Sequence, residues 1–307
     1  MPKAKSMIIL ISGIVGLFVS LYGLYSAIFR SSQIWYSFFT VGSFLFFASV
    51  SYWLRKDSFL NSVLRKAWLL GLLYLVFLGI TVLVEFYGRF VGSFWTYPYF
   101  DQGELILHVY LLGYPFAFLS VIPLFEIVEH LILSGISGPS KPAALRPPQT
   151  LYRLLCAGSA VIFVSSLVTA YFVEHWTAEF NFMAMIAGAL GLDLVRTLVH
   201  QRSFIERILS GDYRYAIIVP LASWVAAFLH EVPNTFANEW IYHNVPFTDR
   251  RIFGVNAIVF IVGWLFLTVV PVTIFRLLDD ASSPAECSST LGEGLPWHRP
   301  QGPGRCD

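Results

Sequence analysis

The chain has 307 residues, of which 56% are hydrophobic, 17% aromatic and only 13% charged. Soluble proteins have about a quarter charged residues, so this composition excludes an ordinary water-soluble protein and indicates a membrane protein. The net charge of +1 offers no basic surface to nucleic acid. Cys156, Cys287 and Cys306 show neither metal-ligand spacing nor a disulfide framework.

Eight apolar runs follow one another along the chain. Each is near or above the roughly 20 residues that cross a bilayer as a helix. Because a backbone in lipid has to satisfy its own polar groups, we expect helices and an all-α integral membrane protein. The first run follows two lysines like a signal peptide, but its length and its later counterpart favour a membrane span. The runs are 7–29, 34–54, 67–87, 105–133, 151–173, 182–199, 216–236 and 255–278.

The second half of the chain repeats the first. The segment SFLNSVL at 58–64 recurs as SFIERIL at 203–209, and Glu85 aligns with Glu231 to within one residue. Each half contains an even number of spans, so both enter the membrane from the same side, as parallel four-helix repeats. The predicted parts are a first repeat at 1–133, a linker at 134–150, a second repeat at 151–280 and a disordered tail at 281–307.

Basic residues are unevenly divided between the two sides of this predicted membrane protein. Sixteen of the twenty Lys and Arg residues fall on the side of the N-terminus. The positive-inside rule therefore predicts a cell-membrane protein with both termini in the cytoplasm. The four basic residues on the other side are Arg30, Arg89, Arg250 and Arg251.

Two features of the cytoplasmic side have structural interpretations. The loops at 55–66 and 200–215 mix basic with apolar residues, which predicts short amphipathic helices at the membrane surface. In the sixth span, Asp193 and Arg196 share one helix face, and we expect them to neutralise each other within the bundle.

Ionisable and aromatic residues gather on the opposite side, where we predict the functional site. In each half a span ends with a carboxylate, and a Trp-x-Tyr segment follows about ten residues later. Carboxylates near a low-dielectric boundary suit general acid work, so we predict catalytic roles for Glu85, Glu231 and the adjacent His230. Anchoring in an interfacial aromatic belt is the alternative role of the aromatic residues. The predicted substrate-binding residues are Trp95, Tyr97, His108, Asn234, Trp240 and Tyr242.

A metal site on this side is a second interpretation, because imidazole and carboxylate groups suit zinc and similar ions. Its ligands would be His108, His175, His230, Glu85 and Glu231. No HxxxH or HExxH pattern supports such a site. We therefore predict no metal, and no motif assigns a cofactor.

The first half also carries a series of residues that resembles a known family. After Glu85 come Gly88, Trp95-Thr96-Tyr97, Gly113-Tyr114-Pro115, Phe118 and Ile122-Pro123-Leu124. This series resembles the small membrane domain of the heterodimeric and fused lycopene cyclases of bacteria, archaea and fungi. Phe116, Ala117 and Phe118 stand where that family has a pair of acids. The resemblance implies acid catalysis on a long isoprenoid chain without net redox change, by a cyclase or a hydratase-like relative.

Two classes of function fit the sequence. The first is an enzyme or binding protein for a membrane lipid or isoprenoid, held between the two halves, with aromatic rings that stabilise a developing carbocation. The second is a transporter or a membrane scaffold without catalytic activity. Parallel repeats and ionisable residues inside a span are typical of transporters.

Overall fold

The computed structural model describes residues 2–135, 147–172, 178–199, 201–246 and 249–281. Within these ranges, eight helical segments are long and apolar enough to cross a membrane, which confirms an all-α, multi-pass fold. The spans are α1 (Pro2–Arg30), α2 (Trp35–Leu54), α4 (Ala67–Glu85) with the π-helix η1 (Phe86–Val91), η2 (Leu105–Gly113) with α6 (Tyr114–Gly135), α7 (Gln149–Phe172), α8 (Ala178–Leu198), α10 (Tyr215–Ala237), and η3 (Val259–Gly263) with α11 (Trp264–Ala281).

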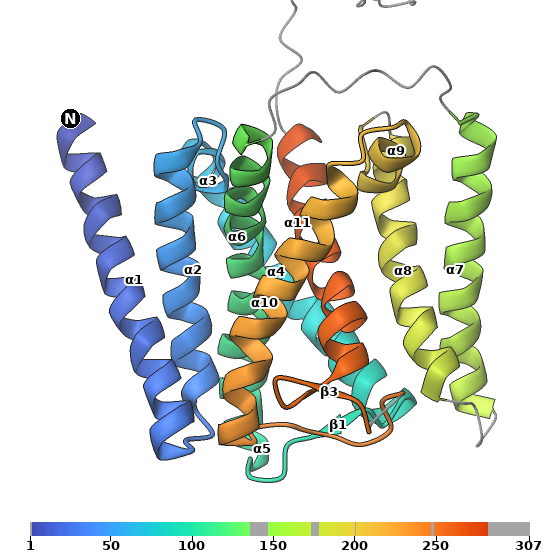
Figure 1. The fold of residues 1–307 in the computed structure, drawn as a ribbon, viewed down its shortest axis with the longest axis horizontal. Helices are drawn as coiled ribbons and strands as arrows, with labels where there is room; N and C mark the ends of the chain where they lie inside the picture. The colour runs from blue at the N-terminus through green and yellow to red at the C-terminus, as the bar shows by residue number, and fades with distance from the viewer. Residues whose placement is uncertain (1, 136–146, 173–177, 200, 247–248, 282–307) are drawn as a thin grey trace, which may run out of the picture.

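The spans pack around a centre formed by α2, α6, α10 and α11 (Figure 1). At one edge α1 packs mainly on α2, and at the other edge α7 packs mainly on α8. Both edge helices expose apolar side chains, such as Phe18 of α1 and Leu154 of α7, each 66% exposed. Such surfaces are suited to lipid rather than to water.

Small residues bring α1 and α2 close together. A Cβ atom on Gly16 would lie 2.6 Å from the backbone nitrogen of Phe46, and one on Gly42 would clash with the backbone of Ser20. The Ser20 and Ser43 hydroxyls lie 3.3 Å apart in the same interface. Close backbone approach through small residues and a polar pair is a common way for helices to associate in lipid.

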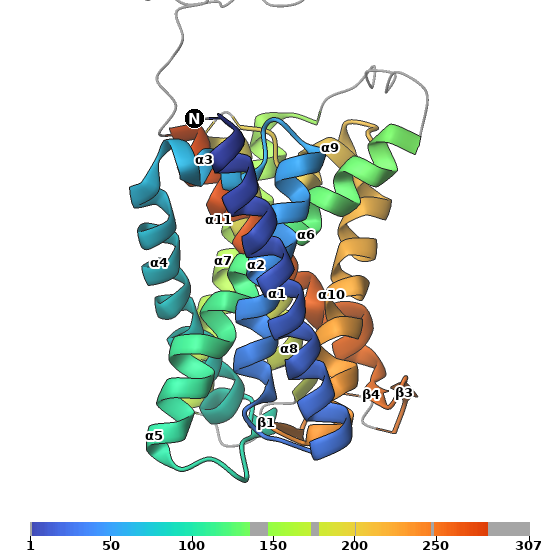
Figure 2. The same ribbon diagram turned by 90° about the vertical axis from the view of Figure 1, so that its left-hand side faces the viewer.

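The two ends of the bundle differ in structure (Figures 1 and 2). One end carries the short helices α3 (Phe59–Arg65) and α9 (Phe204–Leu209), where the sequence predicts amphipathic helices, together with the N-terminus. The other, the ribbon end, carries all the described strands and the short helix α5. The strands and α5 are β1 (Trp95–Thr96), α5 (Gln102–Glu104), β2 (Ile241–Tyr242), β3 (Arg251–Ile252) and β4 (Val255–Asn256).

Buried carboxylates hold α3 and α9 in place. Ser58 and Ser203 are the N-caps of the two helices. Glu126 of α6 accepts a hydrogen bond from the first backbone N–H of α3 at 2.8 Å, and Asp193 of α8 accepts from the first two N–H groups of α9 at 3.1 and 3.0 Å. These groups satisfy donors that a helix N-terminus leaves free.

Asp193 and Arg196 form no direct salt bridge among the described residues, although their charges lie near enough to interact. The Asp193 oxygens bind the backbone of α9, while the Arg196 guanidinium lies 3.8 Å from Asp280 and donates to Gln201 at 3.3 Å. The spacing argument considered one helix alone and could not foresee that another element supplies amide donors.

A third buried carboxylate at this end, Glu129, forms an ionic cluster. Glu129 of α6 accepts hydrogen bonds from Arg55 at 2.5 Å, from Arg276 at 3.0 Å and from the Tyr215 hydroxyl at 2.7 Å. Its partners come from the end of α2, from α11 and from α10. The cluster links four spans with charged groups that are largely buried.

Each half has four spans with a short capped helix between the second and the third, but among the described residues η1 and α5 occur only in the first half and β3 and β4 only in the second. The fourth span of each half contains a proline, Pro123 in α6 and Pro271 in α11, and begins with a π-helix. The predicted linker and tail lie mostly outside the described residues. The division into repeats remains a prediction from the sequence.

Candidate functional site

The first predicted acid lies at the end of α4. Glu85 is fully buried, and its Oε1 atom accepts hydrogen bonds from the Tyr97 hydroxyl at 2.8 Å and from the Trp95 indole at 3.1 Å. Its Oε2 atom has no hydrogen-bond partner among the described residues and lies 4.0 Å from the Arg89 guanidinium. The π-helix η1 begins directly after Glu85, and π-helical turns are frequent at functional sites.

The second predicted acid has an equivalent setting in α10. Glu231 is 3% exposed, and its Oε1 atom accepts from the Tyr242 hydroxyl at 2.8 Å and from the Trp264 indole at 3.0 Å. Its Oε2 atom accepts from the Trp240 indole at 3.3 Å. Three neutral donors therefore hold this carboxyl group, and the described part of the chain provides it with no ion pair.

The ribbon formed by the paired strands β1 and β2 brings the surroundings of the two acids together. Strands β1 and β2 pair antiparallel, with Trp95 opposite Tyr242, and the His243 amide extends the ladder by donating to the Phe94 carbonyl at 2.9 Å. Antiparallel pairing of two equivalent segments is the geometry that a twofold axis generates. The Trp95 and Tyr242 rings meet edge to face at 6.3 Å. Each Trp-x-Tyr segment thus donates hydrogen bonds to the acid of its own half and contacts the segment of the other half.

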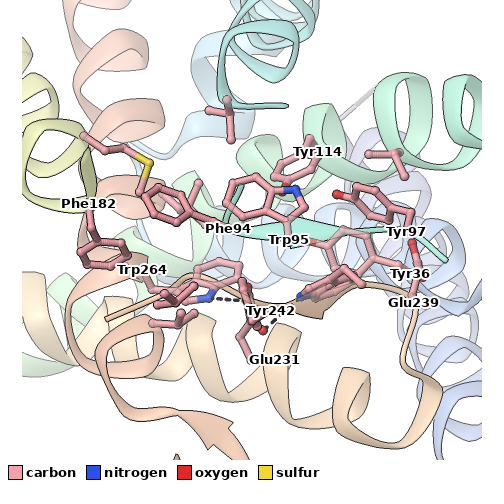
Figure 3. Close-up of a pocket in the computed structure, with 18 residues that line it drawn as sticks. Tyr36, Phe94, Trp95, Tyr97, Tyr114, Phe182, Glu231, Glu239, Tyr242 and Trp264 are labelled. Carbon is pink, nitrogen blue, oxygen red and sulfur yellow. Dashed lines mark hydrogen bonds between the residues drawn. The ribbon is translucent and has the colours of Figure 1, made fainter. Parts of the chain in front are cut away.

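An aromatic cavity of about 60 Å³ lies beside the ribbon (Figure 3). This volume holds a few water molecules or one small group of a ligand. Glu231 and Glu239 are the carboxyl groups in its wall. Its aromatic lining comes from both halves and consists of Tyr36, Phe94, Trp95, Tyr97, Tyr114, Phe182, Trp240, Tyr242 and Trp264.

A second, polar cavity of about 170 Å³ adjoins the first. Asn234, Asn256 and Arg251 contribute polar groups to its wall, and the β3–β4 hairpin closes one side. Glu231 lines both cavities, as do Trp240 and Tyr242. The Glu231 carboxyl group therefore lies at the boundary between an apolar space and a polar one.

Burial keeps Tyr97 and Tyr242, two of the tyrosines in the cavity wall, in their protonated form. It raises the pKa of Tyr242 well above its usual value, and the neighbouring Glu231 raises it further. The pKa of Tyr97 is raised well above its usual value by burial and by Glu85. Both hydroxyls therefore remain hydrogen-bond donors to their acids at neutral pH.

The structure places His230 behind the site rather than in it. Its Nδ1 atom hydrogen-bonds the Tyr36 hydroxyl at 2.9 Å, and its ring packs on Trp264 with 4.6 Å between centroids. It is fully buried and is not part of either cavity wall. This position suits a residue that orients Tyr36 and Trp264, rather than one that touches a ligand.

The two remaining predicted binding residues differ in position. The Asn234 amide donates to the Trp240 carbonyl at 2.8 Å and also lines the polar cavity. His108 lies away from both cavities, where its Nδ1 atom hydrogen-bonds Ser37 at 2.9 Å and its ring packs near Phe100. The site therefore includes Asn234 but not His108.

The alternative metal site has no support from the geometry. No group of three or more His, Cys, Asp or Glu side chains within the described ranges is arranged to hold a metal ion. His175, one of the suggested ligands, lies outside those ranges. His243, a further histidine at this end, hydrogen-bonds the Thr96 hydroxyl at 2.8 Å across the β1–β2 pair.

Several residues that line the site were not among the predicted site residues, and three of them are Trp264, Tyr114 and Glu239. Trp264 and Tyr114 are each the first residue after a π-helix, and the only signal for them was their common place after Gly263 and Gly113. Glu239 gave no such signal, because no acid stands at the matching position of the first half.

Comparisons with known proteins do not assign this site. No protein-family model matches the chain, and no curated protein and no solved structure matches it. Its function is therefore inferred from the contacts and cavities described above.

Proposed function

We propose that this protein is a membrane enzyme that binds the unsaturated end of an isoprenoid chain in the aromatic cavity and protonates it. Glu231 is the proposed acid, because it lies between the aromatic and polar cavities and is held by neutral donors. An apolar wall suits a hydrocarbon, while the polar side lets water resupply the proton. The resemblance of the segment 85–129 to lycopene cyclases suggests the same class of chemistry.

The proposed reaction is an isomerisation. The acid proton of Glu231 forms a bond to one alkene carbon with the π electrons, which leaves a carbocation on the other carbon and a carboxylate on Glu231. The aromatic rings stabilise this cation. A second double bond of the same chain attacks the cation, and a neighbouring carbon of the resulting cation then loses a proton to water of the polar cavity. Water in the polar cavity returns a proton to Glu231, so no net redox change occurs.

The proposal also places the site within the membrane. The excess of basic residues on the side of the N-terminus supports a cell-membrane protein with cytoplasmic termini. The ribbon end then lies at the outer face, and a hydrophobic substrate reaches the site from the lipid. The ligand of the protein is accordingly a membrane isoprenoid.

The proposal is tested with purified protein in liposomes, with lycopene as the probe and D₂O as the solvent. We expect an isomeric product that carries deuterium from the solvent at the protonated carbon. The Glu231→Gln variant is expected to lower the rate by roughly 100- to 10,000-fold, as loss of a general acid does. Glu179→Gln, a change of an exposed carboxyl group at the start of α8, serves as the matched control.

Two results would refute the proposal. One is a folded Glu231→Gln variant with the wild-type rate. The other is a wild-type protein that retains the probe without converting it, which would favour the transporter or scaffold alternative.

A further inference from the structure

Glu239 lies in the wall of the aromatic cavity but has no role in the proposed reaction. It follows Asn238, whose left-handed backbone (φ 54°) ends α10 and turns the chain toward the ribbon. The side chain is 1% exposed and lines the aromatic cavity. In Figure 3 it lies beside Tyr36 and Tyr97, on the opposite side of the cavity from Phe182.

The Glu239 carboxyl group lacks a side-chain hydrogen-bond partner within the described part of the chain. Neither of its oxygens makes a hydrogen bond of normal geometry there, although the backbone N–H of Tyr36 lies near enough to lower the pKa of the group. Burial raises its pKa well above the usual value, and the smaller opposing effect of the Tyr36 backbone does not offset this. Burial therefore favours the neutral carboxylic acid, a form that can both donate and accept a hydrogen bond. Unpaired polar groups of this kind are unfavourable in a protein interior.

The nearby donors are already engaged elsewhere. The Tyr36 hydroxyl bonds His230, the Tyr97 hydroxyl bonds Glu85, and the Trp240 indole bonds Glu231. These three donors are therefore not free for Glu239, and a group inside the cavity that its side chain lines can supply a partner.

We propose that Glu239 binds a hydroxyl group on the part of the ligand that enters the aromatic cavity. This inference rests on the proposed function and adds that, among isoprenoids, the site prefers those with a hydroxyl group over hydrocarbons such as lycopene. A hydroxyl group matches a neutral carboxylic acid because each can donate to and accept from the other. It is also small enough for a cavity of about 60 Å³.

A pair of ligands that differ by one hydroxyl group tests this inference. The probes are geranylgeraniol and its deoxy hydrocarbon, and binding is measured by quenching of tryptophan fluorescence in the wild-type protein. We expect the alcohol to bind about 10- to 100-fold more tightly, because the hydrocarbon leaves the carboxyl group unpaired. The Glu239→Leu variant should lose this preference, while Glu179→Leu should keep it.

Thermal unfolding of the ligand-free protein is a second, independent measurement. Glu239→Leu should raise the Tm by a few degrees, because it removes an unpaired buried group. A lower Tm together with an unchanged preference would identify Glu239 as a structural residue and overturn the inference. Equal binding of both probes to the wild type would overturn this inference alone. Failure to bind either probe would overturn the proposed function as well.

Discussion

Glu129 and Glu231 are both buried carboxyl groups on helices that cross the bundle, at opposite ends of the molecule. Glu129 binds two guanidinium groups and a tyrosine hydroxyl, so each of its oxygens has a charged partner. Glu231 binds only neutral aromatic donors and faces two cavities. A carboxylate neutralised by fixed cations stabilises the structure, whereas one held by neutral donors beside a cavity can exchange a proton with a ligand.

The same contrast applies to the helix caps. Glu126 and Asp193 are satisfied by backbone amides of α3 and α9. At the ribbon end, an oxygen of Glu85 and both oxygens of Glu239 have no hydrogen-bond partner within the described ranges. Among these buried carboxyl groups, those with an unpartnered oxygen therefore lie at the ribbon end, which supports placing function there.

The largest effect is expected from breaking the ionic cluster. Glu129→Gln removes the buried carboxylate that Arg55 and Arg276 share, and the side chains of these two arginines are 19% and 18% exposed. We expect the free energy of unfolding in detergent to fall by about 3–5 kcal/mol. Asp57→Asn is the control, because Asp57 also pairs with Arg55 but has a side chain that is 77% exposed. The control should change stability by less than about 1 kcal/mol, and an equal loss in both variants would contradict the structural role of Glu129.

A smaller effect is expected at the two caps. Glu126→Gln should weaken the hold on α3, and Asp193→Asn the hold on α9, each by about 1.5–3 kcal/mol for a hydrogen bond to a charged group. Hydrogen exchange of the backbone amides distinguishes them, because each variant should accelerate exchange only in its own helix. Acceleration in both helices, or in neither, would show that these carboxylates do not act as separate caps.

Much of the fold followed from hydrophobicity alone. The predicted runs agree with the observed spans, because a chain in lipid has few alternatives to helix. The acid–Trp–x–Tyr pattern also pointed to both acids and to their aromatic partners, since the same pattern occurred twice. A residue pattern that occurs twice in a chain can be recognised from the sequence alone.

The features that do not repeat could not be predicted. Trp264 reaches Glu231 across 33 positions of the chain, and Glu239 faces the cavity only because Asn238 reverses the backbone. His108 looked equivalent to the other polar residues of its side, yet it points to Ser37 of α2. The contacts of these side chains depend on how helices distant in the sequence pack, and not on the local spacing of residues.

The smallest expected effect distinguishes the two acids from each other. Tyr97→Phe leaves Glu85 with one indole donor, Trp95, whereas Tyr242→Phe leaves Glu231 with two indole donors, Trp240 and Trp264. Each change should lower the free energy of unfolding by about 0.5–1.5 kcal/mol, with the larger loss for Tyr97→Phe. Urea unfolding of both variants in the same detergent provides the comparison. The reverse order would mean that Arg89, at 4.0 Å, compensates Glu85 for the lost hydroxyl, and that the two acids are less alike than their aromatic partners suggest.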